Sequence, residues 1–315
     1  NGSPAARIYS STGGGSLDLG TNWSGISGGP TLYRTWAIND TALTSINPDL
    51  EIAVPITGAS ADAGWAKQGG GTLKLSGVGT YVGPTMLNGG YIQLAADNAL
   101  GTGPVTVWGA TGIIADAAPH TLGNTIITVD NNFDVFSFPG ATGTLTFTAS
   151  TVLLNDTRWF RVLDPAQTVV FTGTVTEGGN YAYQRQIQKA GRGTLIFEGP
   201  LNLTGSNGIR IFGDGGTVVL RKNGAFLGTA TNSPDTMLAA VLEVNTGGTL
   251  VLDNSLPGYN LADRLSDTSD VRLYGGTLKF IGANGAASSE NVGYLDVWDP
   301  GPANIVSQVG SGGGS

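Results

Sequence analysis

Two stretches of this chain follow one pattern: Lys67-Gln68-Gly69-Gly70-Gly71-Thr72-Leu73-Lys74-Leu75-Ser76-Gly77 and Lys189-Ala190-Gly191-Arg192-Gly193-Thr194-Leu195-Ile196-Phe197-Glu198-Gly199. They share a core in which a glycine is followed by threonine and then by strand-forming apolar residues. The same core recurs in further units: Gly143-Thr144-Leu145, Gly216-Thr217-Val218, Gly248-Thr249-Leu250 and Gly276-Thr277-Leu278. Repetition of a short strand-forming unit is typical of a solenoid, in which each repeat packs against its neighbours.

The spacing of the units distinguishes a solenoid from other β folds. Gly71 is followed 18 residues later by Gly89, and Gly248 is followed 28 residues later by Gly276. Intervals of about 18–30 residues suit one coil of a parallel β-helix, whereas a sandwich shows a strand about every 8–12 residues and a propeller a period of about 40–50. We therefore predict an all-β parallel β-helix, in which the threonine and leucine of each unit recur at the same place in successive coils.

The composition is rich in glycine and poor in charge, with Gly 51 among 315 residues and 12% charged residues. Hydrophobic residues make up 40% of the chain, which is enough to form a core and argues against a disordered protein. The net charge is -8, and Arg221-Lys222 is the only adjacent pair of basic residues. We expect no nucleic acid as partner, because phosphate binding needs clustered Lys and Arg.

Three regions of the chain differ in amino-acid composition. Residues 1–62 hold Trp23, Trp36 and several prolines, and we expect an irregular N-terminal module or a cap of the solenoid. Residues 63–309 carry the repeats and form the predicted β-helix. Residues 310–315 are rich in Gly and Ser and are interpreted as a linker or as the start of a following repeat. No apolar run reaches the roughly 20 residues of a membrane helix, so we expect no direct membrane span.

The segment Lys67–Leu94, continued by Ala99–Val107, resembles the passenger-associated (autotransporter-associated) β-strand repeat of bacterial secreted proteins. The likeness is strong over Lys67–Val107, fair over Lys189–Leu220 and partial elsewhere. The resemblance implies a right-handed parallel β-helix, displayed outside a Gram-negative-type cell, whose repeat aids export and folding there. It implies no catalytic residues.

Candidate catalytic residues are few. His120 is expected in a surface turn. Because it is the only histidine, it cannot form a histidine metal cluster. Carboxylates from adjacent coils are the other possibility, because glycoside hydrolysis needs two carboxyl groups about 5–10 Å apart. We interpret the acidic residues as solvated loop acids and predict that the chain is not an enzyme, with a glycoside hydrolase or lyase as the alternative. The acids considered are Asp156, Asp164 and Glu177, and Asp263, Asp267 and Asp270.

Two kinds of binding site remain candidates. Asp130, Asn132 and Asp134 place oxygen ligands close together, as calcium prefers, although their spacing matches no calcium motif. Asp296 with Asp299 is a second acidic patch, and no other cofactor is predicted. Aromatic side chains on a β-helix face can stack on sugar rings, and filling the core is the alternative. The aromatic candidates are Trp65, Tyr81, Tyr91, Trp108, Trp159, Phe160, Tyr181 and Tyr183.

The leading functional hypothesis is an extracellular structural or adhesive module, one of several along a bacterial surface fibre, sheath or adhesin. The repeat residues are then scaffold. The expected partners are other copies of the chain, neighbouring modules, surface glycans or cell receptors. A polysaccharide-binding or polysaccharide-degrading β-helix protein is the first alternative. A self-assembling filament, sheath or virion subunit is the second.

Overall fold

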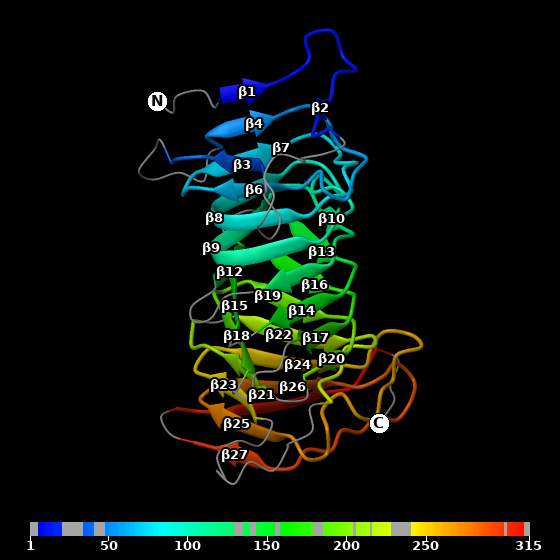
Figure 1. Ribbon diagram of the computed structural model, residues 1–315. Helices are drawn as coiled ribbons and strands as arrows, with labels where there is room; N and C mark the ends of the chain where they lie inside the picture. The colour runs from blue at the N-terminus through cyan, green and yellow to red at the C-terminus, as the bar shows by residue number, and fades with distance from the viewer. Residues whose placement is uncertain are drawn as a thin grey trace.

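The computed structural model describes residues 6–20, 34–40, 48–128, 135–138, 143–154, 158–178, 185–203, 206–214, 216–227, 241–298 and 301–311. Within these ranges the chain forms 28 β-strands and no α-helix, and the strands stack into an elongated body (Figure 1). Every ladder between two of these strands is parallel. The prediction of an all-β, solenoid-like parallel architecture is therefore confirmed.

The strands form three ladders, which we name faces one, two and three. Face one runs through β1 (Ala6–Ile8), β4 (Leu50–Ile52), β7 (Thr72–Leu75), the second halves of β8 (Thr85–Leu94) and β9 (Val105–Ala115), β12 (Val135–Phe138), β15 (Arg158–Val162), β18 (Arg185–Ala190), β21 (Ser206–Ile211), β23 (Val241–Asn245), β25 (Asp270–Tyr274) and β27 (Leu295–Val297). Face two runs through β3 (Arg34–Ala37), β6 (Trp65–Gln68), the first halves of β8 and β9, β11 (Ile126–Thr128), β14 (Thr151–Leu154), β17 (Val175–Gly178) and β20 (Leu201–Asn202). Face three runs through β10 (His120–Leu122), β13 (Thr144–Phe147), β16 (Thr168–Phe171), β19 (Thr194–Phe197), β22 (Thr217–Arg221), β24 (Thr249–Asp253), β26 (Thr277–Ile281) and β28 (Asn304–Gln308). Strands β2 (Leu17–Asp18) and β5 (Ile56–Thr57) pair separately.

Faces one and two belong to one 18-stranded sheet, because β8 and β9 each cross the corner between them. In β8, Thr85–Asn88 pairs on face two and Tyr91–Leu94 pairs on face one. The backbone turns at Gly89 and Gly90, whose φ angles are 103° and 64°. Only glycine adopts such angles without strain, so these residues permit the bend.

Face three holds the most regular repeat of the chain. Threonines lie in register along it, half-buried, in successive strands: Thr144, Thr168, Thr194, Thr217, Thr249 and Thr277. The following residue in each strand is apolar and buried, as Leu145, Leu195 and Leu250 show. This alternation places one set of side chains in the core and the other outside, as a half-buried strand requires.

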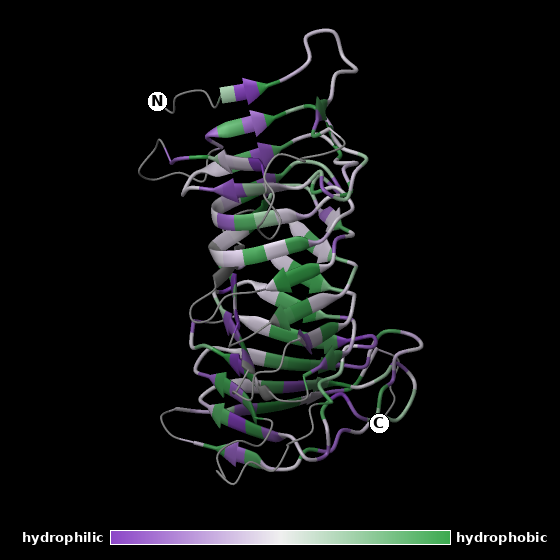
Figure 2. Ribbon diagram, in the orientation of Figure 1, coloured by the Kyte–Doolittle hydropathy of each residue, from purple (hydrophilic) through white to green (hydrophobic). Residues whose placement is uncertain are grey.

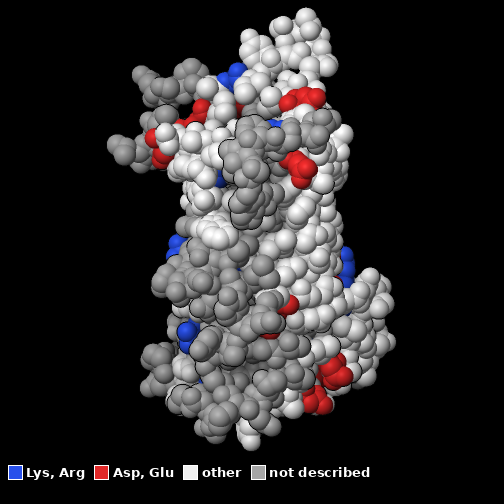
Figure 3. Space-filling model, viewed as in Figure 1, with Lys and Arg blue, Asp and Glu red and all other residues white. Residues whose placement is uncertain are grey.

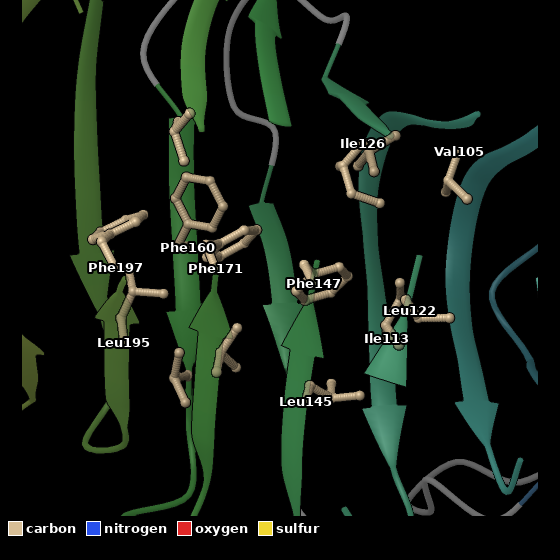
Figure 4. Close-up of a cluster of buried hydrophobic side chains, with 14 of the residues drawn as sticks. Val105, Ile113, Leu122, Ile126, Leu145, Phe147, Phe160, Phe171, Leu195 and Phe197 are labelled. Carbon is tan, nitrogen blue, oxygen red and sulfur yellow. The ribbon is translucent and has the colours of Figure 1, made fainter. Parts of the chain in front are cut away.

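Phenylalanine rings from successive coils stack in the core (Figure 4). The ring centroids of Phe147 and Phe171 are 4.9 Å apart, and those of Phe171 and Phe197 are 5.7 Å apart. Phe160, from face one, meets Phe171 edge-on at 5.6 Å. Burying one such side chain stabilises the fold by about 1.5–3 kcal/mol, and an aromatic pair adds about 0.5–1.5 kcal/mol. This packing stabilises a chain that has no cysteine.

Hydrophobic residues concentrate in the strands at the middle of the stack, where Figure 2 shows most of the green colour. Connecting segments are paler or purple. None of the described segments forms a helix able to cross a lipid bilayer.

Candidate functional site

The repeated Lys-x-Gly-x-Gly-Thr motif forms a corner between two strands. Lys67 lies in β6 and Thr72 begins β7, so the first copy joins face two to face one. Lys189 lies in β18 and Thr194 begins β19, so the second copy joins face one to face three. The prediction that every unit occupies one place in its coil is therefore wrong for Thr72, although the units from residue 143 onward share face three. The motif specifies a bend at glycine, and a coil has more than one corner that needs such a bend.

The ammonium group of Lys67 points into the corner formed by its own motif. Nζ donates hydrogen bonds to the carbonyl oxygens of Gly69, at 2.8 Å, and Gly89, at 2.9 Å. Gly89 belongs to the following coil, so the lysine links two coils. The residue is 0% exposed. A buried carbonyl without a donor costs about 1–3 kcal/mol, and the ammonium group prevents that cost.

Lys189 makes the same kind of contact with its own corner in a later coil. Its Nζ donates to the carbonyl oxygens of Ala190, at 3.0 Å, and Gly191. The backbone N–H of Gly191 donates in turn to the carboxylate of Asp214, from the following coil. Lys189 is also 0% exposed. Both copies of the motif therefore place a buried lysine against the backbone of their corner.

Glycines leave the space that both ammonium groups occupy. A Cβ atom at Gly90 would lie 2.5 Å from Lys67 Nζ, and a Cβ atom at Gly216 would meet Lys189 Nζ even more closely. Backbone carbonyl oxygens, of Gly71 at the first position and of Gly191 at the second, also lie too close for a Cβ atom, so both positions require glycine. The first glycine of each motif also has a φ of 80°; these residues are Gly69 and Gly191. The motif thus combines a lysine with the glycines that admit it.

Burial lowers the pKa of both lysines from 10.5 to about 8, and in each case a carboxylate opposes the shift, Asp49 for Lys67 and Asp214 for Lys189. A lysine with a lowered pKa serves as base or nucleophile in some enzymes. Here each Nζ is enclosed by carbonyl oxygens and has no exposed surface for a substrate. The geometry supports a scaffold role for both side chains.

Two further buried side chains clamp the backbone in the same manner, and neither was predicted from the sequence. Asn124 and Arg264 are each 0% exposed. Asn124 Nδ2 faces carbonyl oxygens of an adjacent coil: Leu100 at 3.1 Å, Gly101 at 3.1 Å and Gly103 at 2.7 Å. The Arg264 guanidinium donates to four oxygens: Asn254 Oδ1 at 2.6 Å and the carbonyls of Lys222 at 3.0 Å, Gly224 at 2.8 Å and Tyr259 at 2.9 Å. Neither residue lies in a repeated motif, so no local signal marks it.

Glu290 binds the backbone on the other side of Arg264. Its two carboxylate oxygens accept the N–H groups of Arg264, at 3.0 Å, and Leu265, at 2.8 Å. Burial raises the pKa of Glu290 to about 7, and the charge of Asp263 acts in the same direction. A raised pKa beside a second carboxylate also characterises acid catalysts. In Glu290 both carboxylate oxygens already accept backbone N–H groups, so the arrangement supports a role in holding the fold.

The structure brings one pair of predicted acids together around an arginine. Arg272 lies 3.9 Å from Asp270 and 3.6 Å from Asp296, measured between side-chain nitrogen and oxygen. Burial raises the pKa of Asp270, and Arg272 opposes that rise. Asp164 accepts the N–H of Ala166 in a turn, Glu177 lies in β17, Asp267 is exposed, and Asp156 and Asp299 fall outside the described residues.

His120 lies in β10 and is 7% exposed, so the prediction of a surface turn is wrong. Strand β10 pairs with β13, where His120 lies opposite Leu145. This pairing makes His120 part of the ladder on face three and buries it. Its Nε2 lies 2.9 Å from Asp116 Oδ1, and its Nδ1 lies 3.4 Å from Asp97 Oδ1. In the part of the chain that the structure describes, no three His, Cys, Asp or Glu side chains gather to hold a metal. The calcium candidates Asp130, Asn132 and Asp134 lie outside it.

The aromatic candidates divide between core and surface. Trp65 and Tyr81 are 0% exposed and Phe160 is 1% exposed, so these three fill the interior. Trp108 is 41% exposed. Tyr91 and Trp159 are half-buried, while Tyr181 and Tyr183 fall outside the described residues.

Comparison of the chain with protein-family models, with curated proteins and with solved structures returned no match.

Proposed function

We propose that the chain is a non-catalytic structural and adhesive module of an extracellular surface or fibre protein, wound as a right-handed β-helix. The supporting observation is the buried lysine corner, which occurs twice with the same chemistry. A side chain held against backbone carbonyls, with no exposed surface, stabilises the corner, and Lys67 in addition links two coils through Gly89. Right-handed winding agrees with the strong preference of parallel β-strand crossovers for that hand.

Resistance to force and to unfolding is the property that these features supply. Parallel ladders satisfy backbone groups coil by coil, and Lys67, Lys189, Asn124 and Arg264 satisfy carbonyls at corners. Stability in a stacked solenoid is approximately a sum of contacts between neighbouring repeats. Such a module suits a spacer that carries load between a surface and its partners.

The proposed setting is the cell surface, with neighbouring modules, further copies of the chain, surface glycans or receptors as partners. On the side shown in Figure 3, acidic and basic residues lie scattered among uncharged ones. Because the charge density is low, we expect modules to contact one another through strand edges and apolar side chains rather than through a charged patch.

Single-molecule stretching tests the mechanical role. We expect the purified chain to resist force until coils unravel, and the double variant Lys67→Met/Lys189→Met to unravel at lower force. Equal unfolding forces for the two proteins would remove the support for a mechanical role.

A panel of acidic and neutral polysaccharides tests the absence of catalysis. We expect no new reducing ends or unsaturated products in the presence of the chain. Product formation that disappears in Asp270→Asn or Asp164→Asn would show that the chain is an enzyme.

A further inference from the structure

A groove of about 480 Å³ lies on face one, above the corner that holds Lys189. Its floor is Ala190 and Gly191, which contribute no large side chain, while the coils on either side contribute Trp159 and Phe212. A Cβ atom at Gly191 would collide with the carbonyl group of Val162, so this position in the floor requires glycine. Ligand sites commonly have volumes of about 300–1,000 Å³, which places this groove in the range for a small molecule or one sugar unit.

Two aromatic rings, each with an arginine beside it, lie next to the floor. The rings of Trp159 and Phe212 stack across it, with centroids 4.5 Å apart and an interplanar angle of 22°. The Arg161 guanidinium carbon lies 5.7 Å from the centre of the Trp159 ring, and that of Arg210 lies 5.7 Å from the centre of the Phe212 ring. Leu163, 43% exposed, forms an apolar wall. The groove therefore offers apolar contact and positive charge together.

The charges around the groove favour an anionic ligand. Arg210 forms an ion pair with Glu243, but Arg161 is exposed and pairs with no carboxylate among the described residues. Lys189 lies beneath the floor, and the carboxylate of Asp214, which also lines the groove, accepts the N–H of Gly191. The open donor at the groove is thus the Arg161 guanidinium, whose planar fork matches a carboxylate or a sulfate. An open cation of this kind is notable in a chain of net charge -8.

A second pair of aromatic rings lies further along the solenoid axis, beyond the groove. Phe212, Asn245, Tyr274 and Trp298 occupy equivalent positions at the ends of β21, β23, β25 and β27. The rings of Tyr274 and Trp298 lie 6.1 Å apart, and Trp298 is 52% exposed. We name this line of three aromatic residues and one asparagine the aromatic row; its elongated form fits a linear ligand better than a compact one.

We propose that the groove and this aromatic row bind an acidic oligosaccharide. Arg161 pairs with a carboxylate or sulfate of one sugar, while the apolar faces of the sugar rings pack against Leu163, Trp159 and Phe212. The next sugars follow the row toward Tyr274 and Trp298. This binding names a ligand class for the adhesive role proposed above, on which it rests, and is independent of the mechanical role that the stretching experiment tests.

Calorimetric titration with three matched probes tests the proposal. The probes are an oligogalacturonate, the same oligosaccharide with its carboxylates reduced to alcohols, and a sulfated neutral oligosaccharide. We expect the uncharged probe to bind at least tenfold more weakly than the better acidic probe, and the acidic probe to weaken as salt rises. The two acidic probes distinguish a carboxylate from a sulfate as the recognised group.

Variants identify the site. Arg161→Gln should lower the affinity for the acidic probe about tenfold or more, and Trp159→Ala should lower that affinity as well. Lys279→Gln removes the same charge from face three and should leave affinity unchanged. Circular dichroism of each variant shows whether it is folded. Absence of binding to every probe, equal affinity for charged and uncharged probes, or affinity unaltered in folded Arg161→Gln and Trp159→Ala would each overturn the proposal.

Discussion

Lys67 Nζ lies 2.9 Å from the carbonyl oxygen of Gly89, a residue of the next coil. The contact joins two coils at a corner where the backbone ladder bends. Because the amine is fully buried, its hydrogen bonds do not compete with water at that site. Lys189 Nζ donates to the carbonyl oxygens of Ala190 and Gly191 within its own corner, so the two residues independently test the role of a buried ammonium group at a corner.

Replacing Lys67 by Met keeps most of the apolar stem and removes the donor. We expect Lys67→Met to lower the free energy of unfolding by about 1–3 kcal/mol, because carbonyl oxygens are left without a donor. Lys189→Met should cost a similar amount. The double variant should show roughly the sum, since the two sites share no partner. Urea unfolding followed by tryptophan fluorescence measures all three, and unchanged midpoints would contradict the clamp.

The pH dependence of stability provides a second test of these lysines. Their pKa is about 8 in the folded chain and 10.5 as the unperturbed value, so the folded state holds fewer protons between these pH values. The free energy of unfolding should therefore rise relative to the double Met variant as pH increases from 8 to 10.5. As pH falls through 8, that gain is lost. If the difference in free energy of unfolding between the native chain and the double Met variant did not change with pH, the lowered pKa would be excluded.

Two neighbouring glycines of the first corner should respond differently to alanine. Gly90 has a φ of 64° and a Cβ there would lie 2.5 Å from Lys67 Nζ. We expect Gly90→Ala to destabilise the chain by about 2–4 kcal/mol through strain and overpacking. Gly70 has open space around it, so Gly70→Ala should change stability by no more than about 0.5 kcal/mol. Thermal unfolding of both variants measures this difference in stability. Equal melting temperatures for Gly90→Ala and Gly70→Ala would count against the corner geometry.

Arg264 should be among the most sensitive positions in the C-terminal part. Removing its guanidinium leaves several oxygens without donors, and Arg264→Ala should cost about 3–5 kcal/mol. Arg264→Lys should recover only part of this, because one ammonium cannot reach acceptors spread around a planar fork. Arg192→Ala, at an exposed position, is the control and should be nearly neutral. Hydrogen exchange at the Phe226 N–H, which donates to the Arg264 carbonyl at 2.7 Å, reports the local effect. Unaltered exchange in Arg264→Ala would refute the clamp.

Glu290 should give the opposite pH response to the lysines. Its pKa is about 7 in the folded chain and 4.5 as the unperturbed value, so the folded state holds more protons between them. The resulting stabilisation is fully present below pH 4.5 and is lost as pH rises through 7. The stability of the native chain relative to Glu290→Gln should therefore fall across this window. Chemical denaturation at several pH values measures the difference, and a constant difference would argue against the raised pKa.

Several features of the fold were predictable because they are local. Glycine followed by threonine and alternating apolar residues specifies short half-buried strands, and the intervals between the units match coils better than hairpins or blades. Parallel stacking followed from these two facts. The units on face three, including Thr194, Thr249 and Thr277, then fell into one ladder.

The positions of polar side chains were decided only by the tertiary structure. Whether Lys67, Arg264 or His120 is buried depends on which coil passes over it, and Thr72 lies on face one because the same corner motif serves different corners. The groove likewise joins Arg161 to Phe212 across an intervening coil. Strand formation depends on the backbone and on adjacent residues, which the sequence by itself determines. Burial, pairing and the grouping of distant side chains depend on coil register, which arises only when the chain closes on itself.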